Sequence, residues 1–178
     1  MLIRLAVAAA LLFSLPAFAT TVLAADIAAQ AEDSSAVVEA VVRGNAPFDS
    51  KTAWYTDTTL EVQRVLGGSA PASFTVRQMG GNRGDKVSHV PGDATLREGD
   101  RVVAFVRQID GQHYLTALAQ SVWVIEDDGS VHRDLDGLAF YAVDEKGAVT
   151  PAIETVPAPT TLEALEAAVK GLSFAERR

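Results

Sequence analysis

The sequence of 178 residues contains no cysteine. A chain without thiols forms no disulfide, carries no lipid on a cysteine and has no thiol nucleophile. Histidine is scarce as well: His89, His113 and His132 are too far apart in sequence to form a zinc signature, and the last two are expected at solvated strand or turn edges. We therefore expect a fold held together by its hydrophobic core alone.

Basic residues are also few. Lys and Arg number 15 against 23 Asp and Glu, which gives a net charge of −8. An acidic surface repels nucleic acid and anionic lipid. We therefore expect no nucleic-acid partner and, after removal of an N-terminal leader, no membrane partner.

The first 24 residues have the composition of a cleavable signal peptide. Arg4 precedes an apolar run over Leu5–Leu15, and small residues follow this run. An uncleaved membrane anchor is the alternative, but the run is shorter than the roughly 20 residues that span a bilayer. We predict an exported protein, periplasmic or secreted.

Two small-residue patterns are compatible with cleavage, Ala17-Phe18-Ala19 and Val22-Leu23-Ala24. The second leaves more room for the apolar region before it, so it is preferred, and the mature chain then begins near Ala25. The remaining chain divides by composition into a lead-in at 25–35, a β domain at 36–150, a Pro-rich linker at 151–159 and a C-terminal helical segment at 160–178.

Apolar periodicity predicts strands throughout the β domain. Ser35–Gly44 and Arg101–Arg107 have apolar residues on both parities, as in strands that are covered on both faces. Trp54–Leu66 alternates between apolar and polar residues, as in a half-buried strand. The domain is therefore expected to contain both central and partly exposed strands.

Three glycine-containing pairs predict hairpin turns in the second half of the chain: Asp110-Gly111, Asp128-Gly129 and Lys146-Gly147. An Asp-Gly pair favours a type I′ turn, because both turn positions need a positive φ. Successive hairpins of this kind predict an antiparallel meander.

A helix is predicted near the C-terminus. Thr160 and Glu163 have the spacing of a capping box, and apolar residues follow at intervals of three and four. The whole pattern predicts a mainly β fold, either a small antiparallel barrel of OB-like type or a sandwich, with this single C-terminal helix packed on it.

The segment Met79–Asp100 is rich in glycine and poor in apolar residues. Such a loop on a β scaffold frequently carries binding residues, and turn formation is the alternative. We predict that it engages a protein partner through Arg83, Asp85, Lys86 and His89. No catalytic residue and no cofactor are predicted, because neither a nucleophile elbow nor a phosphate-binding loop is present.

Acidic residues cluster between positions 126 and 136. Asp127, Asp128, His132 and Asp134 define the alternative function, a metal-dependent hydrolase or a calcium-binding domain. The cluster lacks the ligand spacing of an EF-hand. We therefore predict no metal site and favour non-catalytic binding over hydrolysis.

Four short motifs resemble a group of exported bacterial β domains that have no assigned activity. The motifs are Val76-Arg77-Gln78, Gly80-Gly81, Val90-Pro91-Gly92 and the run Glu98–Val106. Some domains of that group look like companions of matrixin-type secreted peptidases, and the strand order is similar to netrin-like domains of OB type, whose usual cysteines this chain lacks. The resemblance implies a secreted peptidase as partner and assigns no residue a role. An envelope protein is the other partner that we expect for an exported binding module.

Overall fold

The computed structural model describes residues 20–50, 53–152 and 158–175. The first 19 residues of the predicted signal peptide and the middle of the predicted linker lie outside the described residues. The helical elements are α2 (Ile27–Glu32), η1 (Leu118–Ser121, a 3-10 turn) and α3 (Leu162–Val169). The strands are β1 (Thr20–Leu23), β2 (Ala36–Asp49), β3 (Trp54–Gly68), β4 (Ser73–Met79), β5 (Gly81–Arg83), β6 (Lys86–Ser88), β7 (Arg101–Ile109), β8 (Gln112–Leu115), β9 (Val122–Ile125), β10 (Val131–His132), β11 (Leu138–Val143) and β12 (Val149–Pro151).

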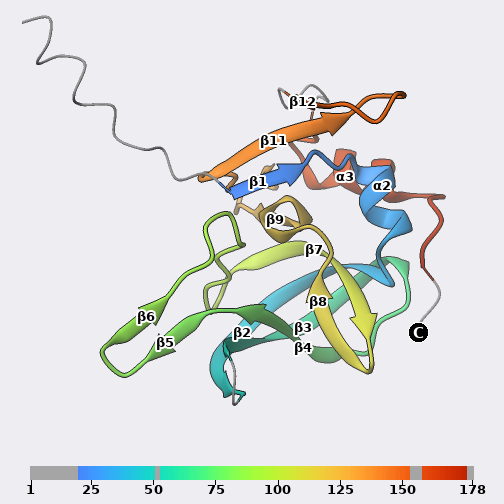
Figure 1. The fold of residues 1–178 in the computed structure, drawn as a ribbon. Helices are drawn as coiled ribbons and strands as arrows, with labels where there is room; N and C mark the ends of the chain where they lie inside the picture. The colour runs from blue at the N-terminus through green and yellow to red at the C-terminus, as the bar shows by residue number, and fades with distance from the viewer. Residues whose placement is uncertain (1–19, 51–52, 153–157, 176–178) are drawn as a thin grey trace, which may run out of the picture.

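Five strands form a ring, the lower part of the molecule in Figure 1. Neighbours follow the order β7-β2-β3-β4-β8, and β8 pairs with β7 as well, which joins the two ends of the row. All contacts are antiparallel except that between β4 and β8, which is parallel at Val76 and His113. A five-stranded ring of this kind is typical of OB-type barrels. The prediction of a mainly β fold with a C-terminal helix is confirmed.

The central strands of the barrel are apolar on both faces because each face meets a different core. On β7, Val102, Ala104 and Val106 belong to the core inside the barrel. Val103 and Phe105 belong to a second core on the outer face. Residues of β2 divide between the two cores in the same way. The predicted burial of both faces of these two strands is confirmed.

Helices α2 and α3 cover the outer core (Figure 1). Ala31 of α2 and Leu165 and Val169 of α3 pack in one cluster with Phe105 and Trp123, whose ring centroids lie 5.4 Å apart. Large aromatic side chains contribute much of the area that such a core removes from water. The helices therefore stabilise the barrel from outside.

Among the described residues, no helix is long and apolar enough to span a bilayer.

An ion-pair network joins the barrel to α3. The carboxylate of Glu39 on β2, with a side chain only 8% exposed, lies 2.6 Å from Arg64 and 3.1 Å from Arg101. Arg64 also pairs with Glu166 on α3. One nearly buried carboxylate thus connects three strands, and through Arg64 it also connects them to the helix.

Two details of the predicted elements are wrong. Helix α3 is capped by Thr161, whose hydroxyl accepts a hydrogen bond from the Ala164 N–H at 3.2 Å, so the Thr160 capping box does not form. The late strands also form no single meander, because β11 pairs with β1 and β12 in a separate sheet of three strands. Strand β10 is two residues long and ends the barrel sheet before β11 begins.

Turns occur at all three predicted positions, but their geometry differs. Asp110 and Gly111 have φ values of 50° and 80°, as a type I′ turn requires. At the other two pairs the glycine alone has a positive φ, 82° at Gly129 and 80° at Gly147. The type I′ prediction is wrong there, because an aspartate carboxylate near each glycine accepts backbone N–H groups and closes a longer turn.

Candidate binding site at the barrel mouth

At one end of the barrel, the inward-facing residues change from apolar to polar. On β3, Leu60 lies in the barrel core. Thr58 and Thr56 lie on the same face of the strand, closer to its beginning. On β4, Val76 lies in the core, and Gln78 lies on the same face of the strand, closer to its end. The mouth of a β-barrel is a frequent place for a ligand site, and polar groups placed there fix the orientation of a ligand.

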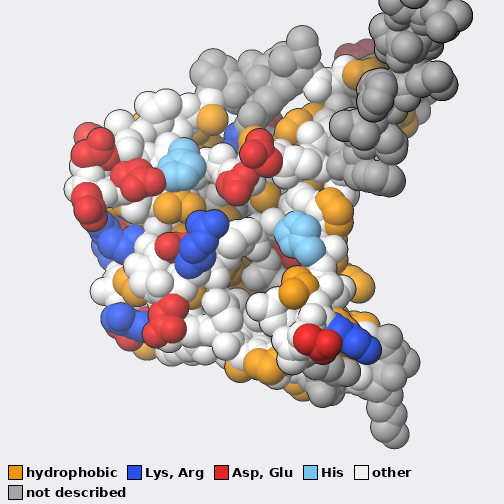
Figure 2. Space-filling view, turned by 90° about the vertical axis from the view of Figure 1, so that its left-hand side faces the viewer, with side chains coloured by type: hydrophobic (Ala, Val, Ile, Leu, Met, Phe, Trp, Pro, Cys, Tyr) orange, Lys and Arg blue, Asp and Glu red, His pale blue; other side chains and the backbone are white. Residues whose placement is uncertain are grey.

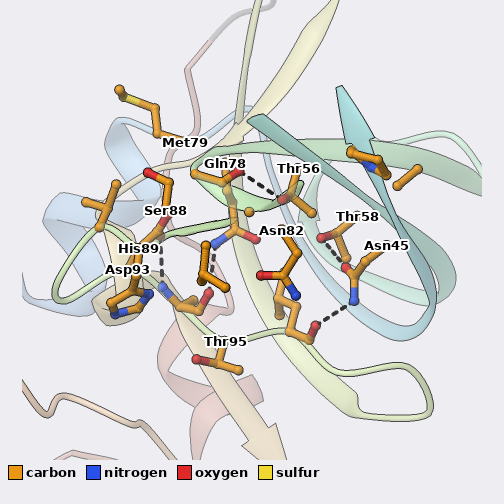
Figure 3. A pocket seen from close by; sticks show the side chains of 18 residues that line it. Asn45, Thr56, Thr58, Gln78, Met79, Asn82, Ser88, His89, Asp93 and Thr95 are labelled. Atoms are coloured by element: carbon orange, nitrogen blue, oxygen red, sulfur yellow. Dashed lines mark hydrogen bonds between the residues drawn. The ribbon is translucent and has the colours of Figure 1, made fainter. Parts of the chain in front are cut away.

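These side chains line a cavity of about 370 Å³, shown in Figure 3. Its walls come from the end of β2, the start of β3, the end of β4, the β5–β6 hairpin and the loop after that hairpin. The polar lining residues are Asn45, Thr56, Thr58, Gln78, Asn82, Ser88, His89, Asp93 and Thr95. Ligand pockets generally measure roughly 300–1,000 Å³, so the cavity suits a short segment or a small molecule.

Hydrogen bonds order the floor of the cavity. The Thr58 hydroxyl donates to Asn45 Oδ1 at 2.6 Å, and Asn45 Nδ2 donates to the Leu96 carbonyl at 3.0 Å. The Thr56 hydroxyl donates to the Gly80 carbonyl at 3.0 Å. The lone pairs of both hydroxyls and the second N–H of the Asn45 amide take no part in these bonds. Thr58 itself is only 1% exposed, so Thr56 and Asn45 are the floor residues that can accept hydrogen bonds from a ligand and donate to it.

A half-buried carboxylate lies in the loop wall. Gln78 Nε2 donates to the Ala94 carbonyl at 2.8 Å, and the Ala94 N–H donates to Asp93 Oδ1 at 2.8 Å. Burial raises the pKa of Asp93, and hydrogen bonds together with the nearby His89 oppose this shift only in part. His89 and Asp93 lie next to each other at one side of the cavity in Figure 3. A cationic group of a ligand would stabilise the charged form of this carboxyl.

The rim of the cavity is hydrophobic. Met79 and Val87 line it with side chains that are 59% and 72% exposed. The Met79 side chain extends away from the polar floor in Figure 3. An apolar rim above a polar floor suits a ligand that carries apolar groups on a polar chain.

Two glycines let the hairpin wall pass close to the floor. Gly80 has φ 92°, and a Cβ there would lie 2.5 Å from the Ser88 carbonyl oxygen. Gly81 has φ 132°, and a Cβ there would clash with the Thr56 hydroxyl. Residues with side chains rarely adopt such φ values. The Gly80-Gly81 pair is therefore needed to shape the cavity.

The four predicted binding residues are not all brought together. His89 lines the cavity. Asp85 and Lys86 are exposed on the β5–β6 hairpin and are not part of the lining. Arg83 ends β5, and its side chain lies outside the described part of the chain. Lining residues that were not predicted from the sequence include Asn45, Thr56, Thr58, Gln78 and Asp93.

The acidic region adjoins a second cavity, of about 350 Å³. Asp127, His132 and Asp134 line it together with Arg97 and Arg101. Figure 2 shows one face of the molecule, on which acidic and basic side chains lie intermixed, most of them in the left half of the view. Surface charges of both signs compensate one another and are well solvated, so their clustering alone indicates no ligand.

The described residues of the acidic region form no metal site. His132 Nδ1 lies 3.4 Å from Glu126 Oε1, and the Asp128 carboxylate accepts the Ser130 N–H at 2.9 Å within a turn. Throughout the described ranges, no three His, Asp or Glu side chains are grouped closely enough to hold a metal ion. The ligand set that a metal-dependent hydrolase needs is therefore not assembled in that part of the chain.

His113 lies in a different place from the one expected. Its side chain is only 8% exposed, and its ring lies over Phe74 with a centroid distance of 4.3 Å. The expectation of a solvated edge is wrong because β8 is enclosed between β4 and β7. His113 thus contributes to packing at the barrel closure.

No protein-family model, curated protein or solved structure matches the chain. Fold and site together define an OB-like β-barrel with a polar cavity at its mouth. The resemblance to exported bacterial β domains stays a prediction from short motifs.

Proposed function

We propose that this protein is an exported, non-catalytic binding module that receives a segment of a protein partner in the barrel-mouth cavity. The change of inward positions from Leu60 and Val76 to Thr58 and Gln78 carries the proposal. Polar groups inside a barrel destabilise it unless they are hydrogen-bonded. Their concentration around an open cavity favours ligand binding over core packing as their role.

A peptide segment satisfies the rim and the floor together. The backbone of such a segment needs both donors and acceptors, and the Asn45 amide and the Thr56 hydroxyl offer both. Met79 and Val87 offer apolar contact to a side chain of the partner, and methionine adapts well to varied shapes. A secreted peptidase or an envelope protein is the kind of partner expected.

Charge favours a basic segment over an acidic one. The chain carries a net charge of −8, which attracts basic partners over a distance of about a Debye length. Within the cavity, Asp93 is partly buried without full compensation of its charge. A Lys or Arg side chain of the partner would supply that compensation.

Co-purification from cells that export the protein tests the proposal. Met79→Glu with Val87→Glu introduces two charges at the rim, and Val65→Glu with Val149→Glu is the matched control at two other exposed valines, 44% and 60% exposed. We expect the rim pair to lose a protein that the native chain and the control pair recover. Recovery of the same proteins by all three chains would count against the cavity as the binding site.

A further inference from the structure

Strand β1 pairs with one edge of strand β11. The two strands are parallel, with Thr20 opposite Leu138 at the start of the register. The Thr20 N–H donates to the Gly137 carbonyl and the Ala24 N–H donates to the Tyr141 carbonyl, both at 2.8 Å. Strand β12 occupies the other edge of β11. The residues of β1 lie inside the segment predicted as the signal peptide, yet they are paired in the fold.

The buried side chain of Gln120 depends on the end of β1. It is 3% exposed, donates from Nε2 to the Leu23 carbonyl at 3.1 Å and accepts at Oε1 from the Ala25 N–H at 3.1 Å. A buried amide that loses its partner keeps the full cost of its desolvation. Cleavage after Ala24 would remove Leu23 and with it this acceptor.

Strand β1 also supports the loop that walls the barrel-mouth cavity. The Thr20 hydroxyl donates to the Pro91 carbonyl at 2.5 Å. Gly92 lies so close to β11 that a Cβ there would clash with Leu138. The next residue is Asp93, which lines the cavity. Removal of β1 would therefore take away a contact to Pro91, which lies directly after the lining residue Val90.

We propose that the leader is removed after Ala19, so that the mature chain begins at Thr20 and keeps β1, an inference that rests on the export proposed above. Ala17 and Ala19 supply the two small residues of an A-x-A cleavage motif, and the apolar run Leu5–Leu15 has a suitable length. Hydrolysis adds water across the peptide bond, leaving a carboxylate on Ala19 and an ammonium on Thr20. That ammonium keeps an N–H for the Gly137 carbonyl.

The intact mass of the exported protein tests this cleavage site. The full chain is expressed with its own leader, and we expect the mass of residues 20–178. The mass of residues 25–178 would overturn the inference and leave export intact, whereas an uncleaved chain would overturn both. Ala19→Arg should eliminate the 20–178 product, and the matched variant Ala24→Arg, at an exposed position, should change its mass by the substitution alone.

A comparison of two shortened chains gives a readout that does not depend on the processing enzyme. Chains that start at Thr20 and at Ala25 are purified, and their Tm and amide hydrogen exchange are measured. We expect the shorter chain to have a lower Tm and to lose exchange protection in β11, because this strand loses its neighbour. Equal Tm and equal protection in β11 would contradict a structural role for β1.

Discussion

The barrel interior differs between its core and its mouth, although the same strands build both. Leu60 and Val76 are fully buried and remove apolar area from water. Two residues away on each strand, the polar residues Thr58 and Gln78 line the cavity, although Thr58 is itself only 1% exposed. Under the proposed function, stability and binding are thus assigned to different parts of β3 and β4. Substitutions in the core should change folding, and substitutions at the mouth should chiefly change recovery of the partner.

The largest effect is expected in the core. Leu60→Ala should reduce the free energy of unfolding by about 2–5 kcal/mol, because the lost contacts leave a cavity. Urea denaturation followed by tryptophan fluorescence measures this change. Partner recovery per folded molecule should stay unchanged, and a specific loss of binding would break the separation of core and mouth.

The next largest effect is expected outside the barrel, away from the mouth. Glu39→Gln should cost about 1.5–3 kcal/mol, because Arg64 and Arg101 lose charged hydrogen bonds to a nearly buried carboxylate. Glu61→Gln is the matched control, since its bidentate pair with Arg43 is about half exposed and solvent screening should leave a smaller loss than at Glu39. Equal shifts in Tm for both variants would show that burial of Glu39 has no special role.

At the mouth, Thr58→Val keeps the shape of the side chain and removes its hydroxyl. We expect a loss of about 0.5–1.5 kcal/mol in stability, because Asn45 loses one hydrogen bond. Partner recovery should fall more than this small loss explains, since the buried hydroxyl holds the Asn45 amide in place at the cavity floor. Full recovery of the partner by a folded Thr58→Val protein would argue that the floor does not take part in binding.

At the mouth, Asp93→Asn should change the thermal stability of the protein by an amount that depends on pH. Burial raises the folded-state pKa of Asp93 above its ordinary value of 3.8, so the native protein loses stability as pH rises through that folded pKa. Asparagine does not ionise, so the variant does not lose stability in this way as pH rises. The variant should therefore have a higher Tm than the native protein at pH 7 and no advantage below about pH 3.8, where the carboxyl is protonated in both states. A Tm difference that does not vary with pH would contradict this explanation.

The smallest effect is expected on the β5–β6 hairpin. Asp85→Ala with Lys86→Ala changes two exposed side chains and should alter stability by less than about 0.5 kcal/mol. If the hairpin makes outer contacts with the partner, recovery should fall, but less than with Thr58→Val. A greater loss than with Thr58→Val would move the binding site from the cavity to the hairpin.

The fold was predictable where apolar periodicity is strong. Arg101–Arg107 is apolar on both parities and became β7, which separates two cores. The sheet of β1, β11 and β12 was not predictable, because nothing local marks Thr20–Leu23 as the partner of a strand more than one hundred residues away. Long-range pairing of this kind depends on the complete fold.

Part of the candidate site could be predicted from the sequence. Thr56 and Thr58 share the parity of Leu60, so their inward position follows from the predicted strand. The convergence of Asn45, Gln78 and Asp93 on the same end of the barrel does not follow, because it depends on the register of separate strands and on the path of the loop. Sequence patterns therefore identified the loop, and the fold was needed to identify the cavity.

Photo-crosslinking in cells that export the protein tests the central claim most directly. A photo-reactive residue replaces Val87 at the cavity rim, or Val65 or Val149 at exposed positions outside the lining. We expect a crosslinked protein partner from position 87, greatly reduced by Thr58→Val in the same chain, and little or none from the other two positions. Crosslinks of equal yield from all three positions, or none from position 87, would contradict binding at the barrel mouth.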